Sequence, residues 1–278
     1  MLKTRVITAC ILLLVFLLAL FFLPKLGWAA LVTVMLMQGI SEWSCLSKLP
    51  GKSAPAYWWL TLAVMLGIVW IDMQQINQAW LLHLCIYAVS AVLWLLLVPV
   101  WLSARWKVRQ PLLMALTGWA VLIPTAVAMI DLRAQSPWLL LSLMGLVWAA
   151  DITAYFTGRK FGKHKLAPSI SPGKTWEGVI GALLGASVYV LSLVWGNGMA
   201  AAYPMLPGLL LASWLVVGLA VFGDLFESAI KRQAGVKDSG ALLPGHGGLL
   251  DRIDALTSTL PLVAMIMLLL SRGLPWAA

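Results

Sequence analysis

The chain of 278 residues is 62% hydrophobic and only 10% charged, contains 16 tryptophans and has a mean hydropathy of +0.95. About one half of a typical soluble domain is apolar, so this composition excludes that class and predicts an all-α, polytopic integral membrane protein. Basic loops lying against an anionic membrane leaflet explain the net charge of +9 without a nucleic-acid partner.

Nine apolar stretches are long enough, or nearly so, to cross a hydrocarbon layer of about 30 Å as helices. In chain order they cover residues 6–23, 26–41, 54–71, 79–102, 111–130, 137–157, 178–195, 206–226 and 255–270. The first follows Lys3 and Arg5 and resembles a secretory signal. Its length, and Lys25 directly after it, favour a retained helix instead.

The basic residues divide unevenly between alternate connections of these nine helices. The N-terminal segment and every second connection after it hold 16 of the 19 Lys and Arg residues. The connections between these, with the C-terminal segment, hold 3. Lys and Arg accumulate on the cytoplasmic side of membrane proteins. We therefore expect a cytoplasmic N-terminus and a C-terminus on the outer side.

Polarity divides the chain into two regions, 1–130 and 131–278. Seven of the ten acidic residues fall between positions 151 and 254. The first region is predicted to be a scaffold of transmembrane helices, and the second a catalytic region with two cytoplasmic site loops, 158–177 and 224–254. The three acidic residues outside this part are predicted to lie solvated at loop ends: Glu42, Asp72 and Asp131.

The first site loop contains SPGKTWEG, in which Lys174 and Thr175 resemble the end of a P-loop. That motif requires glycine at position 168, where Pro168 stands, so a P-loop is excluded. A turn at Ser171 would instead present Lys174 and Thr175 at the start of a helix, where backbone N–H groups and the helix dipole favour an anion. A simple helix-capping turn is an equally good interpretation.

Asp151 interrupts an apolar stretch about six residues from its end, or about 9 Å deep at 1.5 Å per residue. An ionisable residue at this depth costs a few kcal/mol unless it is paired or hydrated. We therefore expect Asp151 to shape a polar cavity, the alternative being a structural hydrogen bond. A transporter would place more polar groups at mid-membrane, whereas here they gather at one face.

The second site loop carries carboxylates from two helix ends. Asp224, Glu227 and Lys231 have the spacing of one helical stripe, and Asp251 and Asp254 lie one turn apart. Such carboxylates are hard oxygen ligands suited to one or two Mg²⁺ ions that leave positions open for phosphates. A salt bridge between Glu227 and Lys231 is the competing interpretation.

Three groups of residues share the order and spacing of a known signature. They are Asp151-x-x-Ala154-Tyr155-x-x-Gly158-Arg159; Ser171-Pro172-x-Lys174-Thr175-x-Glu177-Gly178; and Ser228-x-x-Lys231-Arg232, Lys237-Asp238, Pro244-x-His246-Gly247-Gly248-x-x-Asp251-Arg252-x-Asp254. In these the chain resembles the phosphatidate cytidylyltransferases, or CDP-diacylglycerol synthases. The first hundred residues match only in hydrophobic character, and Gly173 stands where many members have a basic residue. The chain lacks the D-G-x-x-A-R motif of the CDP-alcohol phosphotransferases.

The resemblance implies transfer of a cytidylyl group from CTP to phosphatidic acid in a bacterial inner membrane, at a site that faces the cytoplasm. It implies Mg²⁺ on Asp224 and Asp251, as one or two ions, with room for a second, monovalent cation. A homodimer is left open. The residues expected to act in catalysis are Asp224, Asp251, Lys231, Arg232, Lys237, Asp238, His246, Arg252 and Asp254, and those expected to bind substrate are Ser171, Lys174, Thr175, Asp151, Gly247 and Gly248.

Overall fold

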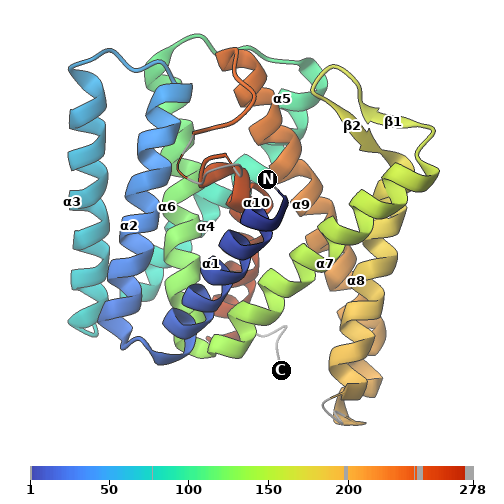
Figure 1. Cartoon of the computed structure of the whole chain (residues 1–278). Coiled ribbons are helices and arrows are strands. Elements are labelled where there is room, and N and C mark those ends of the chain that lie inside the picture. The colour runs from blue at the N-terminus through green and yellow to red at the C-terminus, as the bar shows by residue number, and fades with distance from the viewer. Residues whose placement is uncertain (1, 77, 197–199, 241, 243–246, 273–278) are drawn as a thin grey trace.

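The computed structural model describes residues 2–272 apart from 77, 197–199, 241 and 243–246, and gives only the backbone of residues 2–10 and 200–202. The described chain is a bundle of helices with one small hairpin (Figure 1). Its elements are α1 (Leu2–Phe22), α2 (Lys25–Leu46), α3 (Ser53–Met73), α4 (Ala79–Val92), η1 (Leu93–Leu97), α5 (Val98–Ala104), α6 (Pro111–Gln135), α7 (Pro137–Phe161), β1 (Lys165–Ala167), β2 (Ser171–Thr175), α8 (Trp176–Gly196), η2 (Ala200–Met205), α9 (Leu206–Ala234) and α10 (Leu250–Ser271).

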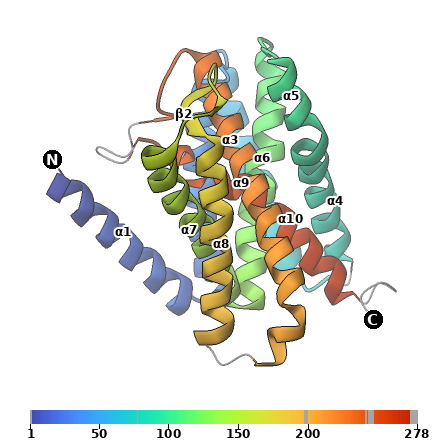
Figure 2. The same cartoon turned by 90° about the vertical axis from the view of Figure 1, so that its right-hand side faces the viewer.

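The predicted all-α membrane fold is confirmed. Eight of the nine predicted stretches fall in helices of sufficient length and hydropathy to cross a membrane. The remaining stretch lies in α1. The part of α1 whose side chains are described, Ile11–Phe22, is an apolar helix shorter than the other eight. This helix leans away from the rest of the bundle (Figure 2).

Several helices run further than the predicted stretches. α2 continues from residue 41 to Leu46, α9 from 226 to Ala234, and α10 begins at Leu250 rather than at 255. The apolar pattern stops at the first polar side chains, whereas the backbone hydrogen bonds of the helix do not. As a result, the carboxylates predicted to lie in loops or at helix ends project from the sides of helices.

Three helices form the centre of the bundle. About half or more of the most apolar part of α2, α6 and α10 is buried, in contrast to 17% for the span that contains α9. Trp28 and Trp43 on α2 donate to the carbonyls of Met129 and Met114 on α6, at 3.1 and 2.7 Å. The indole of Trp43 lies where a side chain at Gly118 would stand, so the glycine permits this close approach.

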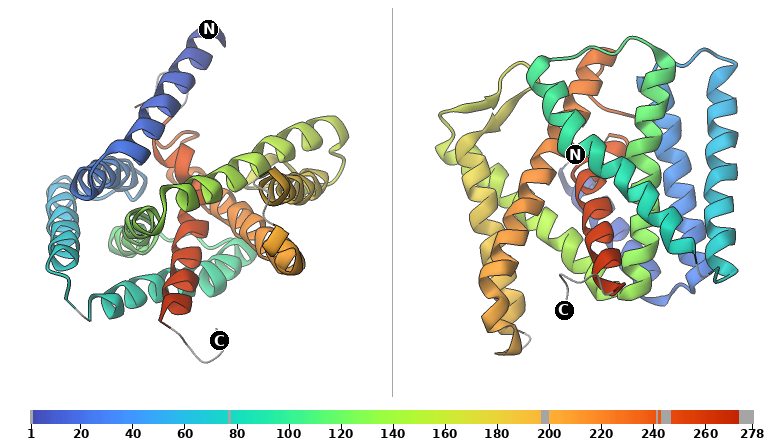
Figure 3. Two further views of the ribbon diagram at one scale, coloured as in Figure 1. Left: turned by 90° about the horizontal axis from the view of Figure 1, so that it is seen from below. Right: turned by 180° about the vertical axis from the view of Figure 1, so that it is seen from behind.

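α7 and α8 pack together as an arm at the side of the bundle (Figure 3). Gly181 and Gly185 on α8 face Thr157 and Thr153 on α7, and a Cβ at either glycine would overlap the threonine. Small residues of this kind let transmembrane helices approach closely. β1 and β2 join the two helices as an antiparallel hairpin. The connections after α2, α5, α7 and α9 all lie at the top of Figure 1, an end that we call the site end.

Candidate active site

α9 carries the predicted stripe of polar residues to the site end. The helix reaches Ala234 and stops before Gly235, whose φ of 84° suits glycine. Ser228 donates weakly to Asp224 at 3.4 Å, and Lys231 lies 3.1 Å from Glu227. The predicted helical continuation and the Glu227–Lys231 ion pair are therefore both confirmed.

An ion pair joins the two site loops. Lys174 Nζ on β2 lies 2.5 Å from Asp224 Oδ2 on α9. Asp151 on α7 interacts electrostatically with both residues, and its side chain is accessible. Since α7 continues to Phe161, Asp151 lies ten residues, or about 15 Å, before the helix end, whereas it was predicted about six residues from the end of the apolar stretch.

Asp251 is held by more hydrogen bonds than Asp224. Its Oδ2 accepts hydrogen bonds from the backbone N–H groups of Ser239 and Gly248, at 2.9 and 2.8 Å, and from the Ser239 hydroxyl at 3.1 Å. Its Oδ1 accepts from Lys231 Nζ at 2.6 Å. One oxygen is thus held by three hydrogen bonds, while the other is paired only with the Lys231 ammonium, which a bound cation would have to replace.

Glu42 was predicted to be solvated, and this is wrong. The side chain is buried on α2 and makes four hydrogen bonds. It accepts from Ser239 Oγ at 2.8 Å and from the backbone N–H groups of Leu249 and Leu250 at 2.8 and 3.0 Å. The fourth donor is Gln38 Nε2, one turn earlier on α2, at 3.0 Å.

Glu42 therefore caps α10 from another helix. The first N–H groups of a helix have no partner within it, and a negative charge beside them is favourable. Through Ser239, whose hydroxyl donates to Glu42 and whose backbone N–H donates to Asp251, Glu42 also fixes the chain around Asp251. A side chain at Gly248 would overlap Ser239 and Glu42, so the glycine is required for this packing.

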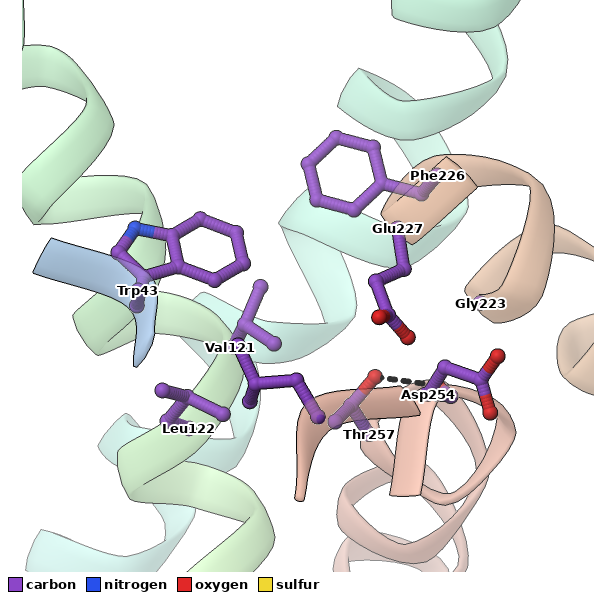
Figure 4. A pocket seen from close by; sticks show the side chains of 9 residues that line it. Trp43, Val121, Leu122, Gly223, Phe226, Glu227, Asp254 and Thr257 are labelled. Atoms are coloured by element: carbon purple, nitrogen blue, oxygen red, sulfur yellow. Dashed lines mark hydrogen bonds between the residues drawn. The ribbon is translucent and has the colours of Figure 1, made fainter. Parts of the chain in front are cut away.

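Glu227 and Asp254 border a small cavity between α2, α6, α9 and α10. Its volume is about 10 Å³, roughly the space of one water molecule. Glu227 is buried and points into it (Figure 4). Its carboxylate is paired with Lys231, whose Nζ lies 3.1 Å from Oε1. A hydrated divalent cation nearby would meet these hard oxygen donors by replacing the lysine.

The first site loop forms a hairpin, and the turn predicted at Ser171 is wrong. Ser171 to Thr175 form strand β2, and the turn lies before them at residues 168–170. Thr175 is buried, and its Oγ1 accepts from the N–H of Gly178 at 3.1 Å. This is the helix-capping interpretation of Thr175, while Lys174 extends toward Asp224.

The remaining predicted residues lie around this centre. Arg232, Lys237, Asp238 and Arg252 are exposed, and Arg232 donates to the carbonyl of Val236 at 3.2 Å. Gly247 has a φ of 83°, and a side chain there would press on Asp251. His246 lies outside the described residues.

A second acidic group stands at the opposite end of the bundle, where α3 and α6 end and α4 begins. Asp72 and Asp131 were predicted to be solvated, but both are partly buried and paired with His83, at 2.9 and 2.7 Å. Tyr87 donates to Asp131 at 2.7 Å. In the described part of the chain, Asp72, His83 and Asp131 are close enough together to hold a metal ion, but they lie far from the two site loops.

Comparison with known proteins identifies the family. The model of the cytidylyltransferase family matches residues 3–270. The chain belongs to this family. It is 37% identical over 279 residues to a phosphatidate cytidylyltransferase of Haemophilus influenzae, covering 94% of this chain and 96% of that protein. A phosphatidate cytidylyltransferase of Pseudomonas aeruginosa is 37% identical over 282 residues, covering 99% and 100%. A third, of Thermotoga maritima, is 44% identical over 125 residues, covering 44% and 46%. The predicted resemblance is confirmed.

The cytidylyltransferase motifs did not single out Glu42, although one signal was present. The stretch 26–41 is shorter than the roughly 20 residues that a transmembrane helix needs. A helix of full length has to include Glu42, and a carboxylate within a membrane helix calls for a partner. Ser239 carried no such signal, because its contacts depend on how the chain folds between α9 and α10.

Proposed function

We propose that the protein transfers the cytidylyl group of CTP to phosphatidic acid. A phosphate oxygen of phosphatidic acid forms the new bond to the α-phosphorus of CTP. The bond from that phosphorus to the β-phosphate oxygen breaks, and pyrophosphate leaves. The products are CDP-diacylglycerol and pyrophosphate. Full-length relatives named phosphatidate cytidylyltransferase support this reaction.

The observation that carries the proposal is the junction of the two site loops. Lys174 from the first loop pairs with Asp224 on α9. Two turns further along α9, Lys231 pairs with Asp251 on α10. The nucleophile is already an anion, so the protein needs no strong base. Its task is to bring two polyanions together and to neutralise the charge that develops on pyrophosphate.

A divalent metal is expected for this chemistry, and the residues present fit Mg²⁺. Asp224 and Asp251 would hold it, with the oxygens of Glu227 or Asp254 close by. Bound Mg²⁺ would neutralise phosphate charge. One ion or two are compatible with these donors, and a second, monovalent cation is part of the proposal.

The chain's own residues supply the remaining functions. Lys174 and Lys231, freed from their carboxylates, would pair with phosphates, and Arg232, Lys237 and Arg252 would add positive charge. Gly247 and Gly248 would allow the phosphates to approach the backbone. We assign Ser171 and His246 to phosphate binding, Asp238 to orienting the cations, and Asp151 to the polar cavity beside Asp224.

The site end is proposed to face the cytoplasm of a bacterial inner membrane. It carries the basic connections, as cytoplasmic loops do, and it is where a water-soluble nucleotide meets a lipid headgroup. The acyl chains would remain between the helices. A homodimer is compatible with this proposal.

The decisive experiment supplies the purified chain with labelled CTP, phosphatidic acid and Mg²⁺. We expect labelled CDP-diacylglycerol and pyrophosphate in equal amounts. Omission of the lipid should abolish both, since water is then the only acceptor. If the folded, membrane-inserted wild-type chain forms neither product, the proposal is refuted.

A further inference from the structure

A larger cavity lies at the site end, on a different face of α9 from the acidic centre. Its volume is about 660 Å³. The walls are the end of α2, the connection from α5 to α6, the turn of the hairpin and the end of α9. Five basic residues line it: Lys48, Arg105, Lys107, Arg109 and Arg232.

The described lining contains no carboxylate. Five cations around one cavity repel one another, and an isolated basic loop relieves that repulsion by spreading into solvent. Here the charges come from three separate segments that the fold brings to one cavity. Such an arrangement is stabilised by an anion in the middle.

The connection from α5 to α6 is fixed in place by paired hydrogen bonds. Gln233 on α9 accepts from the N–H of Val108 at 2.9 Å and donates to the carbonyl of Val108 at 2.6 Å. Val108 stands between Lys107 and Arg109, so this pair holds both cations beside the end of α9. The backbone of this connection is therefore fixed against α9, while the five basic side chains remain exposed to an incoming anion.

The apolar part of the lining favours a lipid over a nucleotide. Leu46, Trp101, Leu102 and Ile170 contribute to the same walls, and Trp106 lies exposed beside them. Tryptophan is enriched at the membrane interface, and basic pockets between transmembrane helices bind lipid headgroups. We propose that this cavity binds the phosphate group of an anionic membrane lipid. Apart from Arg232, which borders both, the described lining of the cavity contains none of the residues assigned to the acidic centre.

The test measures retention of phosphatidylglycerol by the full chain in a neutral detergent, counted by native mass spectrometry. The double variant Arg105→Gln/Arg109→Gln should lower the affinity about tenfold to thirtyfold, since each basic residue contributes roughly 1 kcal/mol to anionic lipid binding. The matched control Lys52→Gln/Lys163→Gln removes two exposed charges at the same end, outside the cavity. It should change the affinity less than twofold. Equal losses in both variants would reduce the effect to general surface charge and overturn the proposal.

A second variant tests the geometry without changing the charge. Gln233→Leu removes the two hydrogen bonds to Val108 and should lower lipid affinity several-fold, with thermal unfolding monitored to show that the bundle remains folded. Unchanged affinity in a folded Gln233→Leu protein would also contradict the proposal. CTP is added in a final arm: if it displaces phosphatidylglycerol while inorganic phosphate at the same concentration does not, the cavity is a nucleotide site and the lipid assignment is wrong.

Discussion

The two halves of the acidic centre are built in different ways. The inner half, Asp251 with Ser239 and Glu42, is attached to the central helices, and the side chain of Asp251 is only 7% exposed. The outer half, Asp224 with Lys174, lies between α9 and the hairpin of the α7–α8 arm, and the side chain of Asp224 is 37% exposed. A dense set of hydrogen bonds fixes one half, and one accessible ion pair closes the other.

This difference separates positioning from access. A carboxylate whose orientation is fixed by surrounding donors requires little reorganisation when a ligand binds. An exposed ion pair is worth about 1 kcal/mol or less, so an incoming phosphate can replace the carboxylate partner of Lys174 at small cost. We expect mutations of the inner half to remove catalysis, and those of the outer half to weaken substrate binding.

The largest effect is expected for Asp251→Ala. It removes a proposed metal ligand and leaves the backbone N–H groups of Ser239 and Gly248 without their acceptor, and turnover should fall by about a thousandfold or more. The measurement is formation of CDP-diacylglycerol at saturating CTP and Mg²⁺. Helical content and membrane insertion should resemble the wild type. Activity within tenfold of the wild type would exclude Asp251 from the metal site.

Glu42→Gln should have the next largest effect. The amide places an NH₂ group against one of the N–H or hydroxyl donors that Glu42 now accepts, which disturbs Ser239 and Asp251 in turn. Residues that orient metal ligands typically contribute 10- to 100-fold to metal affinity or activity. We expect the Mg²⁺ concentration for half-maximal activity to rise by about that factor, with partial recovery at high Mg²⁺.

A matched control for this change is Ser41→Ala. Ser41 is adjacent on α2, and among the described residues its hydroxyl donates within its own helix, to the carbonyl of Met37. Its Mg²⁺ dependence should equal that of the wild type. If Glu42→Gln lowers the turnover rate at every Mg²⁺ concentration without shifting the midpoint, the residue stabilises the fold and does not position the metal ligand.

The sequence could predict the local features of the site but not its long-range contacts. The spans followed from apolar length, and the α9 stripe followed from the spacing of Asp224, Glu227 and Lys231. Both depend on local periodicity. The bond from Glu42 to Ser239 joins residues 197 positions apart, and no local pattern encodes which helix lies beside the start of α10. Hydropathy also ended α2 too early, and so Glu42 was predicted in solvent.

Lys174→Ala should mainly weaken substrate binding. The change removes the cation that joins the hairpin to α9, and we expect KM for CTP or phosphatidic acid to rise about tenfold with a smaller change in kcat. Lys174→Arg keeps the charge and should recover most of the affinity. A loss confined to kcat would instead place Lys174 on the leaving group in the transition state, and the outer half would then act in catalysis rather than in access.

Thr175→Ala should have the smallest effect, and it separates the two interpretations of this residue. Loss of the hydrogen bond from the Gly178 N–H to Thr175 Oγ1 should destabilise the start of α8 by about 1 kcal/mol. Thr175→Ser keeps the oxygen and should restore that stability, measured by thermal unfolding in detergent. Because Thr175 is buried at the base of the arm, KM should change less than twofold in both variants. A rise in KM that serine repairs, without any change in stability, would instead assign the hydroxyl to phosphate binding and extend the outer half of the site to the start of α8.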